Sequence, residues 1–224
     1  MKYKGFSIIT NFGCDVGCDY CIWKNHKLHN IFTSFENMDW KKLEKYLSIF
    51  PQNKISISGG GDPLFNLDQN LSWYIKLMAI CDNYNKKIDI HTAKILEKND
   101  MYKLFSKYVL HLNYKRFLEY KDILEDFPLP FRLTFVLTRD WTVLKIKEVM
   151  QFAKQLDCQL SFRELYGQHF IWDKGLREAF EYLEEQELLT KRKIRYVKNK
   201  DYNTYMMPNN YIYTDFMCYN DPIF

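Results

Sequence analysis

The 224-residue sequence has no long hydrophobic run and only a small excess of positive charge. No apolar stretch approaches the roughly 20 residues that cross a bilayer, so no transmembrane helix is expected. The apolar run behind Lys2 and Lys4 is too short for a signal peptide, which favours a cytoplasmic location. The net charge is +4 and the basic residues are scattered, so the composition gives no indication of a nucleic-acid surface.

The sequence contains six cysteines but no group of four close together. Cys14, Cys18 and Cys21 form a C-x3-C-x2-C motif, and the other three are isolated along the chain. In a cytoplasmic protein, clustered cysteines indicate metal or redox chemistry rather than disulfides. The isolated cysteines are interpreted as small buried residues.

Thiolates are soft ligands that suit zinc or an iron–sulfur cluster. Together with His26, the three clustered cysteines would complete a tetrahedral zinc site. A cubane of four irons usually takes four cysteines, so three cysteines leave one iron for a ligand that is not protein. Both interpretations stay open on this loop alone, although a zinc site does not need the repeated fold inferred below.

Hydrophobic patterns predict strands and helices in alternation along the chain. The expected strands cover residues 6–10, 54–58, 88–91, 108–112, 131–137 and 159–165. The expected helices cover residues 39–50, 68–85, 94–107, 114–127, 142–156 and 175–189. Such alternation is typical of α/β proteins with a parallel sheet, and six units predict an open, partial (β/α)6 barrel over residues 1–189.

Residues 190–224 depart from this repeat, since they have no helical period and are rich in tyrosine. They predict an aromatic-rich C-terminal extension, with a short hairpin, that covers one mouth of the barrel. Within the repeat, polar residues recur at the carboxyl ends of the expected strands, where parallel α/β folds place their chemistry. These residues are Cys14 to Cys21, Gly59 to Asp62, His91 and Thr92, Asn113, Thr138 and Arg139, and Arg163 and Glu164.

Two motifs in this order carry a family resemblance. The cysteine motif has an aromatic residue, Tyr20, directly before its last cysteine, and the second expected strand ends in Gly59-Gly60-Gly61-Asp62-Pro63. This combination resembles the radical S-adenosylmethionine (radical SAM) superfamily, in which a Gly-Gly-Glu-Pro-like segment follows the cysteine loop. The likeness spans about residues 5–187. Since the C-terminal extension lacks a second group of cysteines, we expect a compact member with a single cluster.

The resemblance implies that Cys14, Cys18 and Cys21 hold one [4Fe-4S] cluster, whose open iron takes the amino and carboxylate groups of S-adenosylmethionine. It assigns cofactor contacts to the glycine loop, where Asp62 stands in place of the family's glutamate. The residues expected to bind the cofactor are Tyr20, Gly60, Gly61, Asp62, Pro63, His91, Asn113, Thr138, Arg163 and Glu164. Among them, Asn113 is expected near the ribose or methionine part, Arg163 near the carboxylate, and Glu164 near the ribose or the substrate.

By the same resemblance, the protein is an enzyme, an oxidoreductase or lyase. It would cleave S-adenosylmethionine reductively, and the 5′-deoxyadenosyl radical would abstract hydrogen from a substrate that is a small, nucleotide-like molecule or a peptide. The electron donor implied is a flavodoxin or ferredoxin. Two alternatives stay open. The chain is a glycyl-radical-enzyme activase that acts on a protein partner, or a non-catalytic zinc protein that uses Cys14, Cys18, Cys21 and His26.

Overall fold

A computed structural model describes residues 5–25, 27–28, 38–96, 103–128, 130–164, 174–187, 194–197 and 204–213. The chain divides into two compact units. The first comprises Met1–Tyr108 and Asp201–Phe224, and the second comprises Val109–Lys200. Each unit has its own part of the sheet and its own helices, and each is described by itself.

The first unit contains five strands in the order β3-β2-β1-β8-β9. Their bounds are β1 (Phe6–Ile9), β2 (Lys54–Ser58), β3 (Lys87–Thr92), β8 (Thr204–Met206) and β9 (Ile212–Tyr213). Strand β1 pairs in parallel with β2 on one side and with β8 on the other, while β8 and β9 form an antiparallel hairpin. The C-terminal segment therefore returns to the strand that leads into the cysteine motif.

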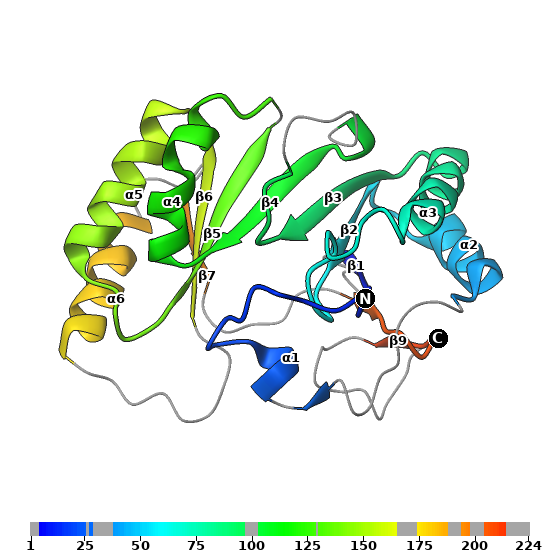
Figure 1. The fold of residues 1–224 in the computed structure, drawn as a ribbon, viewed down its shortest axis with the longest axis horizontal. Coiled ribbons are helices and arrows are strands. Elements are labelled where there is room, and N and C mark those ends of the chain that lie inside the picture. Colours follow the sequence, from blue (N-terminus) through cyan, green and yellow to red (C-terminus); the bar gives the residue numbers. More distant parts are fainter. Residues whose placement is uncertain are drawn as a thin grey trace. The chain divides into compact units, whose positions relative to one another are not determined.

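The helices of the first unit are α1 (Ile22–Asn25), α2 (Trp40–Ile49) and α3 (Leu71–Asn83). Helix α2 begins after Asp39, whose side chain accepts a hydrogen bond from the main-chain nitrogen of Lys42 at 3.0 Å. The buried ring of Phe6 in β1 contacts Tyr46 and Phe50 at the end of α2, with ring centroids 4.6 and 5.6 Å away. This packing holds α2 against the sheet (Figure 1).

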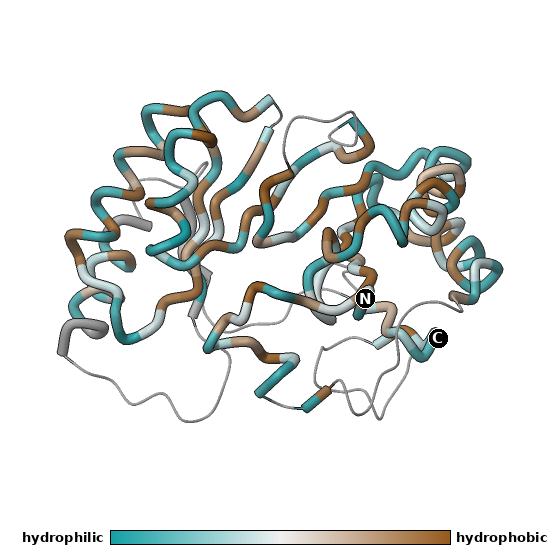
Figure 2. The backbone as a smooth tube through the Cα atoms, in the orientation of Figure 1, coloured by the Kyte–Doolittle hydropathy of each residue, from teal (hydrophilic) through white to brown (hydrophobic). Residues whose placement is uncertain are grey.

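The second unit contains strands in the order β7-β6-β5-β4, with the boundary between the units falling inside β4. The strands are β4 (Lys107–Leu112), β5 (Phe131–Leu137), β6 (Gln159–Glu164) and β7 (Ile194–Val197), and the helices are α4 (Tyr114–Glu125), α5 (Val143–Gln155) and α6 (Lys174–Glu187). Strands β5, β6 and β7 run parallel, and the three helices lie on one face of them (Figure 1). Along α4 and α5, hydrophobic and hydrophilic segments alternate, as amphipathic helices on a sheet require (Figure 2).

Aromatic rings fill the space between the helices and the strands of the second unit. Phe135 of β5 lies 5.1 Å from Trp141, 5.9 Å from Phe162 of β6 and 5.9 Å from Phe117 of α4, measured between ring centroids. All four side chains are at most 1% exposed. Burial of each such ring is worth about 1.5–3 kcal/mol, so this packing is a main source of the unit's stability.

The predicted α/β class is confirmed, and the six predicted strands are present as β1 to β6. The helix predicted over residues 94–107 is wrong for the described part of that range, which contains no α-helix at 94–96 or 103–107. The end of this range pairs with β3 instead, because the nitrogen of Ser106 donates to the carbonyl of Ile88 at 2.8 Å and β4 begins at Lys107. Residues 97–102 lie outside the described ranges.

Three smaller differences concern element ends and the C-terminal segment. Helix α3 begins at Leu71 rather than at Asp68, because turns cover the preceding residues and Asn66 has a positive φ of 48°. The short helix α1 and the strand β7 were not predicted, whereas a hairpin is present within 190–224 as β8 and β9. No helix within the described ranges is long and apolar enough to span a bilayer.

Candidate functional site

The cysteine motif lies on the loop that follows β1. Cys14 is exposed, Cys18 and Cys21 are half-buried, and all three are free thiols. The loop turns back on itself, since the nitrogen of Val16 donates to Cys14 Sγ at 3.3 Å and the nitrogen of Cys21 donates to the carbonyl of Cys18 at 3.2 Å. These contacts hold the three cysteines on one short loop, and the thiolate is the form of cysteine that binds metal.

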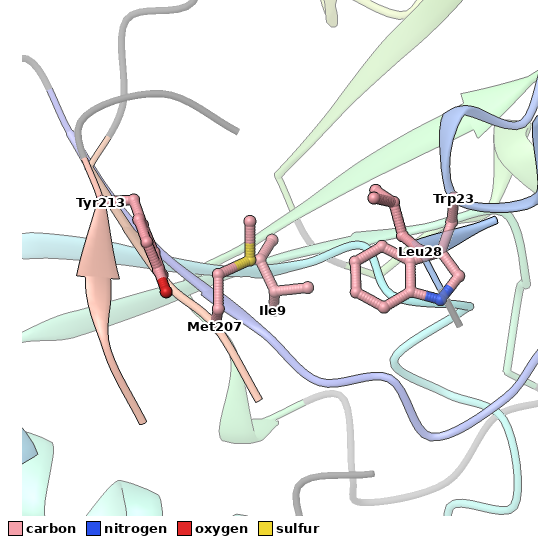
Figure 3. Close-up of a cluster of buried hydrophobic side chains, with 5 residues drawn as sticks. All are labelled: Ile9, Trp23, Leu28, Met207 and Tyr213. Carbon is pink, nitrogen blue, oxygen red and sulfur yellow. The ribbon is translucent and has the colours of Figure 1, made fainter. Parts of the chain in front are cut away.

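A small group of buried side chains packs under the end of this loop, and we call it the hairpin core. Its members are Ile9, Trp23, Leu28, Met207 and Tyr213 (Figure 3). Cys21 packs against this group. Met207 lies beside Ile9 in this view, and it comes from the turn of the β8–β9 hairpin. The C-terminal segment thus anchors the third cysteine, although it lies far from it in the sequence.

The glycine loop follows β2 and touches the beginning of the cysteine loop. Gly61 forms a parallel bridge with Gly13, and the nitrogen of Asp62 donates to the carbonyl of Gly13 at 2.8 Å. A Cβ atom on Gly61 would lie 2.1 Å from that carbonyl oxygen, and one on Gly60 would lie 2.6 Å from the nitrogen of Asn11. Both glycines also have positive φ angles, so only glycine permits this approach.

The carboxylate of Asp62 points into the protein and is 4% exposed. Its Oδ1 accepts hydrogen bonds from the nitrogen of Leu64 at 2.9 Å and from Thr92 Oγ1 at 2.7 Å, and its Oδ2 accepts from the nitrogen of Ala93 at 2.7 Å. We call Asp62, Leu64, Thr92 and Ala93 the Asp62 network. Since Thr92 and Ala93 lie at the end of β3, the network joins the loops that follow β2 and β3.

Tyr74 of α3 supports the same loop from the helix side. Its hydroxyl donates to the carbonyl of Pro63 at 2.5 Å, and the residue is fully buried. Burial, with the charge of Asp62 nearby as a smaller cause, holds the pKa of Tyr74 well above its usual value. The hydroxyl therefore stays protonated and acts as a permanent donor to the loop.

An ion pair joins the end of β3 to the cysteine loop. Lys94 Nζ lies 2.8 and 2.9 Å from the two carboxylate oxygens of Asp15, and its side chain is 26% exposed. The same ammonium group lies 5.2 Å from the ring centroid of Phe65, just after the glycine loop. Within the first unit, each of three segments therefore contacts the other two: the cysteine loop, the glycine loop and the end of β3.

Two other predicted site residues lie in this unit. Tyr20 is half-buried in the turn before Cys21, and His91 is half-buried on β3. Side chains alternate along a strand, so His91 lies on the face opposite to the buried Ile88 and Ile90.

The remaining predicted site residues belong to the second unit. Asn113 caps α4, because its Oδ1 accepts from the nitrogen of Arg116 at 2.8 Å. Thr138 donates to the carboxylate of Asp140 beyond the end of β5. Arg163 is exposed and lies on β6 beside Val136 in the register, and Glu164 lies beside Leu137. All three segments follow or end a strand, as predicted, and the cofactor contacts of these residues stay predictions.

The residues of the cysteine loop fit an iron–sulfur cluster by their chemistry. Three reduced thiols lie within eight residues on an accessible loop, and the glycine loop lies against its first residue. Across the described ranges, no three His, Cys, Asp or Glu side chains are grouped closely enough to hold one metal ion. A cubane presents a different iron to each thiolate, so it does not require the sulfurs to converge on one point. His26, the fourth ligand of the zinc alternative, lies outside those ranges.

The fold was compared with known proteins. No protein-family model matches the chain, and no curated protein matches it significantly. Solved structures do: SuiB of Streptococcus suis bound to S-adenosylmethionine aligns with a TM-score of 0.65 at 15% identity over 98% of this chain. SuiB bound to the precursor peptide SuiA gives 0.67 at 16%, also over 98%. Native anSMEcpe with bound AdoMet and Kp18Cys peptide gives 0.60 at 15% over 95%.

These solved structures are radical SAM enzymes. This chain spans 62% and 61% of the two SuiB chains and 74% of the anSMEcpe chain. At such identities the likeness shows the fold, and the chain has the α/β fold of radical SAM enzymes. The resemblance inferred from the two motifs is therefore confirmed at the level of the fold.

Several residues that shape the site were not singled out from the sequence. Gly13 and Lys94 contact the motif loops directly, and Met207 supports Cys21 from the C-terminal segment. A glycine directly before the first cysteine was a usable signal in the sequence, and the structure gives Gly13 a φ of 101°. No local pattern pairs Lys94 with Asp15, 79 positions earlier.

Proposed function

We propose that the chain is a radical SAM enzyme. The observation that carries the proposal is the direct contact between the two motif loops: the carbonyl before Cys14 accepts from the nitrogen of Asp62, on a fold shared with enzymes that bind S-adenosylmethionine. Cys14, Cys18 and Cys21 would hold a [4Fe-4S] cluster, and the glycine loop beside them would receive the methionine end of the cofactor. When bound, the two groups supply reductive cleavage of S-adenosylmethionine and a radical that abstracts hydrogen from substrate.

The chain's own residues prepare this site. The loop glycines let two main chains approach within hydrogen-bond distance, which leaves no room for side chains between the cysteine loop and the glycine loop. The hairpin core excludes water from one side of Cys21.

The test is anaerobic reconstitution with iron and sulfide, followed by reductant and S-adenosylmethionine. We expect about four irons per chain and release of 5′-deoxyadenosine, both lost in Cys18→Ala. Cys158→Ala is the matched control, since this buried thiol belongs to the second unit, between α5 and β6, and is not part of the motif. Zinc in place of iron and sulfide, or a fully loaded protein that releases no 5′-deoxyadenosine, would contradict the proposal.

We further propose that the substrate is a peptide rather than a nucleotide-like small molecule. Support comes from two of the enzymes with this fold, which were solved with bound peptides, SuiA and Kp18Cys. The test measures release of 5′-deoxyadenosine with pools of short peptides, with nucleosides and with a glycyl-radical enzyme. Stimulation by a peptide pool supports the proposal. Stimulation only by nucleosides, or only by the glycyl-radical enzyme, would replace it with one of those alternatives.

A further inference from the structure

We propose that Asp62 is a positioning residue, which fixes both sides of Cys14 and does not itself bind the ammonium group of the cofactor. The inference rests on the proposed function, because it concerns how that site is held in place. It reverses the role that the motif suggested for this residue. Three observations carry it: the burial of the carboxylate, the donors that surround it, and the two paths from it to the cysteine loop.

The carboxylate is already engaged inside the protein. Oδ1 accepts two hydrogen bonds and Oδ2 accepts one, and the whole residue is 4% exposed. Oδ1 has no acceptor site left, and Oδ2, which keeps one, is buried with the rest of the residue. An ammonium group would have to open the packing around the carboxylate or displace one of its donors. Displacement would leave a buried donor without an acceptor, which costs about 1–3 kcal/mol for each group. The geometry therefore opposes direct binding.

The first path runs through the main chain of the residue. The nitrogen of Asp62 donates to the carbonyl of Gly13, the residue directly before Cys14. The carboxylate also fixes the main chain of Asp62, because its Oδ1 accepts from the nitrogen of Leu64, two residues along, and so forms a side-chain-stabilised turn. One residue thus fixes both the glycine loop and the entry to the cysteine loop.

The second path runs through the end of β3. Asp62 holds Thr92 and Ala93, and Thr92 Oγ1 in turn accepts from the nitrogen of Lys94 at 3.0 Å. The ammonium group of Lys94 then pairs with Asp15, the residue directly after Cys14. The contacts of Gly13 and Asp15, which flank the first cysteine, therefore both depend on Asp62.

This arrangement also explains why an aspartate stands where the family has a glutamate. A turn from a carboxylate onto the nitrogen two residues along suits the short aspartate side chain. A glutamate would place an additional methylene in a site that is 4% exposed, and overpacking of this kind is destabilising. Asp62→Glu should therefore weaken the site, although it introduces the family's own residue.

The experiment compares Asp62→Asn, Asp62→Glu and Thr92→Val in the full-length protein. Three quantities are measured: the melting temperature of the apoprotein, iron retained against a chelator after reconstitution, and the affinity for S-adenosylmethionine from its effect on the spectrum of the reduced cluster. All three variants should retain iron roughly 10-fold less tightly, as is typical for loss of a group that orients a ligand. Affinity for S-adenosylmethionine should fall in Thr92→Val as well as in the Asp62 variants.

Asp89→Asn is the matched control. Asp89 lies on the same strand, and its Oδ1 accepts from Ser106 Oγ at 2.6 Å, so this variant also weakens a hydroxyl–carboxylate hydrogen bond. It should lower the melting temperature by a few degrees and leave iron retention at the wild-type level. Equal iron loss in Asp89→Asn and Thr92→Val would show a general effect of stability and would overturn the proposal.

If Asp62 bound the ammonium group directly, the pattern would differ. Asp62→Asn would lose affinity for S-adenosylmethionine with normal iron retention, Asp62→Glu would bind it well, and Thr92→Val would match wild type. Any of these results overturns the proposal.

The test also works if Asp62→Asn does not fold. In that case Thr92→Val decides alone, because it keeps the carboxylate. Iron retention and melting temperature need no turnover, so a loaded wild type that releases no 5′-deoxyadenosine contradicts the proposed function and not this inference.

Discussion

At the scale of single residues, the site depends on positions where no side chain fits. Gly13, Gly60 and Gly61 meet where the cysteine loop and the glycine loop touch, and each has a positive φ angle. Gly17, inside the cysteine loop, also has a positive φ of 67°, but a Cβ atom there would meet nothing within 4 Å. Gly17 therefore needs glycine only for its backbone conformation, whereas Gly60 and Gly61 also need it because two main chains approach closely there.

Replacement of Gly61 by alanine should be much more damaging than the same change at Gly17. Gly17→Ala should cost about 1–2 kcal/mol, because only the left-handed backbone is strained. Gly61→Ala adds a Cβ atom 2.1 Å from the carbonyl oxygen of Gly13, so the two loops must separate. Urea unfolding and iron retention measure both effects. Equal iron retention in the two variants would show that the contact between the loops is not needed.

His111 of β4 should make the stability of the protein depend on pH. Burial, with Arg163 and Arg132 as smaller causes, lowers the pKa of His111 to about 3 from an ordinary value of 6.5. Between these values the unfolded chain binds more protons than the folded one, so the free energy of unfolding falls as pH falls. The loss is up to about 1.4 kcal/mol per pH unit.

The comparison is with His111→Gln, which removes the titrating group. Denaturant unfolding of both proteins at pH 7, 6 and 5 gives the difference in their free energies of unfolding. This difference should shift in favour of the variant as the pH falls. A difference that stays constant over this range would contradict the lowered pKa.

Cys81 should be almost inert toward alkylating reagents, unlike the motif cysteines. Burial raises the pKa of the Cys81 thiol to about 12, with Asp82 as a smaller cause, whereas Cys14 is exposed. At pH 8 only about one Cys81 thiol in ten thousand is then ionised, and the thiolate is the reactive form. Mass spectrometry of iodoacetamide-treated apoprotein should show Cys14 labelled long before Cys81. Labelling at similar rates would contradict the burial of Cys81.

At the scale of elements, the β8–β9 hairpin supports the cysteine loop. It pairs with β1 on the side opposite to β2 and supplies Met207 and Tyr213 to the hairpin core against which Cys21 packs. The sequence predicted a hairpin here but placed it over a mouth of the barrel. That placement stays a prediction, and the described hairpin residues extend the sheet beside β1.

Met207→Ala should lower both stability and cluster binding. Met207 is fully buried, so the free energy of unfolding should fall by about 2–5 kcal/mol and Cys21 should lose part of its support. Met150→Ala is the control, because Met150 is 3% exposed on α5 in the second unit. The control should lose stability while the folded protein keeps its iron. Iron loss in both variants would mean that the hairpin has no particular role.

At the scale of the whole chain, regular patterns made most of the fold predictable. Strands β1 to β6 and the two motif loops follow from periodicity, turn residues and cysteine spacing, which are local signals. The helix predicted after β3 is wrong in its described part, where the nitrogen and hydroxyl of Ser106 donate to the carbonyl of Ile88, 18 positions earlier. Local propensity carries no information about such a partner.

The interior of the site was harder to predict for the same reason. The cysteines and glycines were identified from their spacing, but the inward direction of Asp62 and its bond to Thr92 depend on how β2 and β3 align. The ion pair of Lys94 with Asp15, and the packing of Met207 near Cys21, join segments that are distant in the sequence. Contacts of this kind appear only once the chain is folded.

The central claim is that three cysteines hold a cluster whose remaining iron takes S-adenosylmethionine. The most direct measurement is the electron paramagnetic resonance spectrum of the reduced, reconstituted protein, recorded with and without S-adenosylmethionine. We predict the signal of a reduced [4Fe-4S] cluster that changes when S-adenosylmethionine is added, and no such signal in Cys14→Ala. A cluster spectrum that S-adenosylmethionine leaves unchanged, or a protein that binds zinc and gives no signal, would contradict the claim.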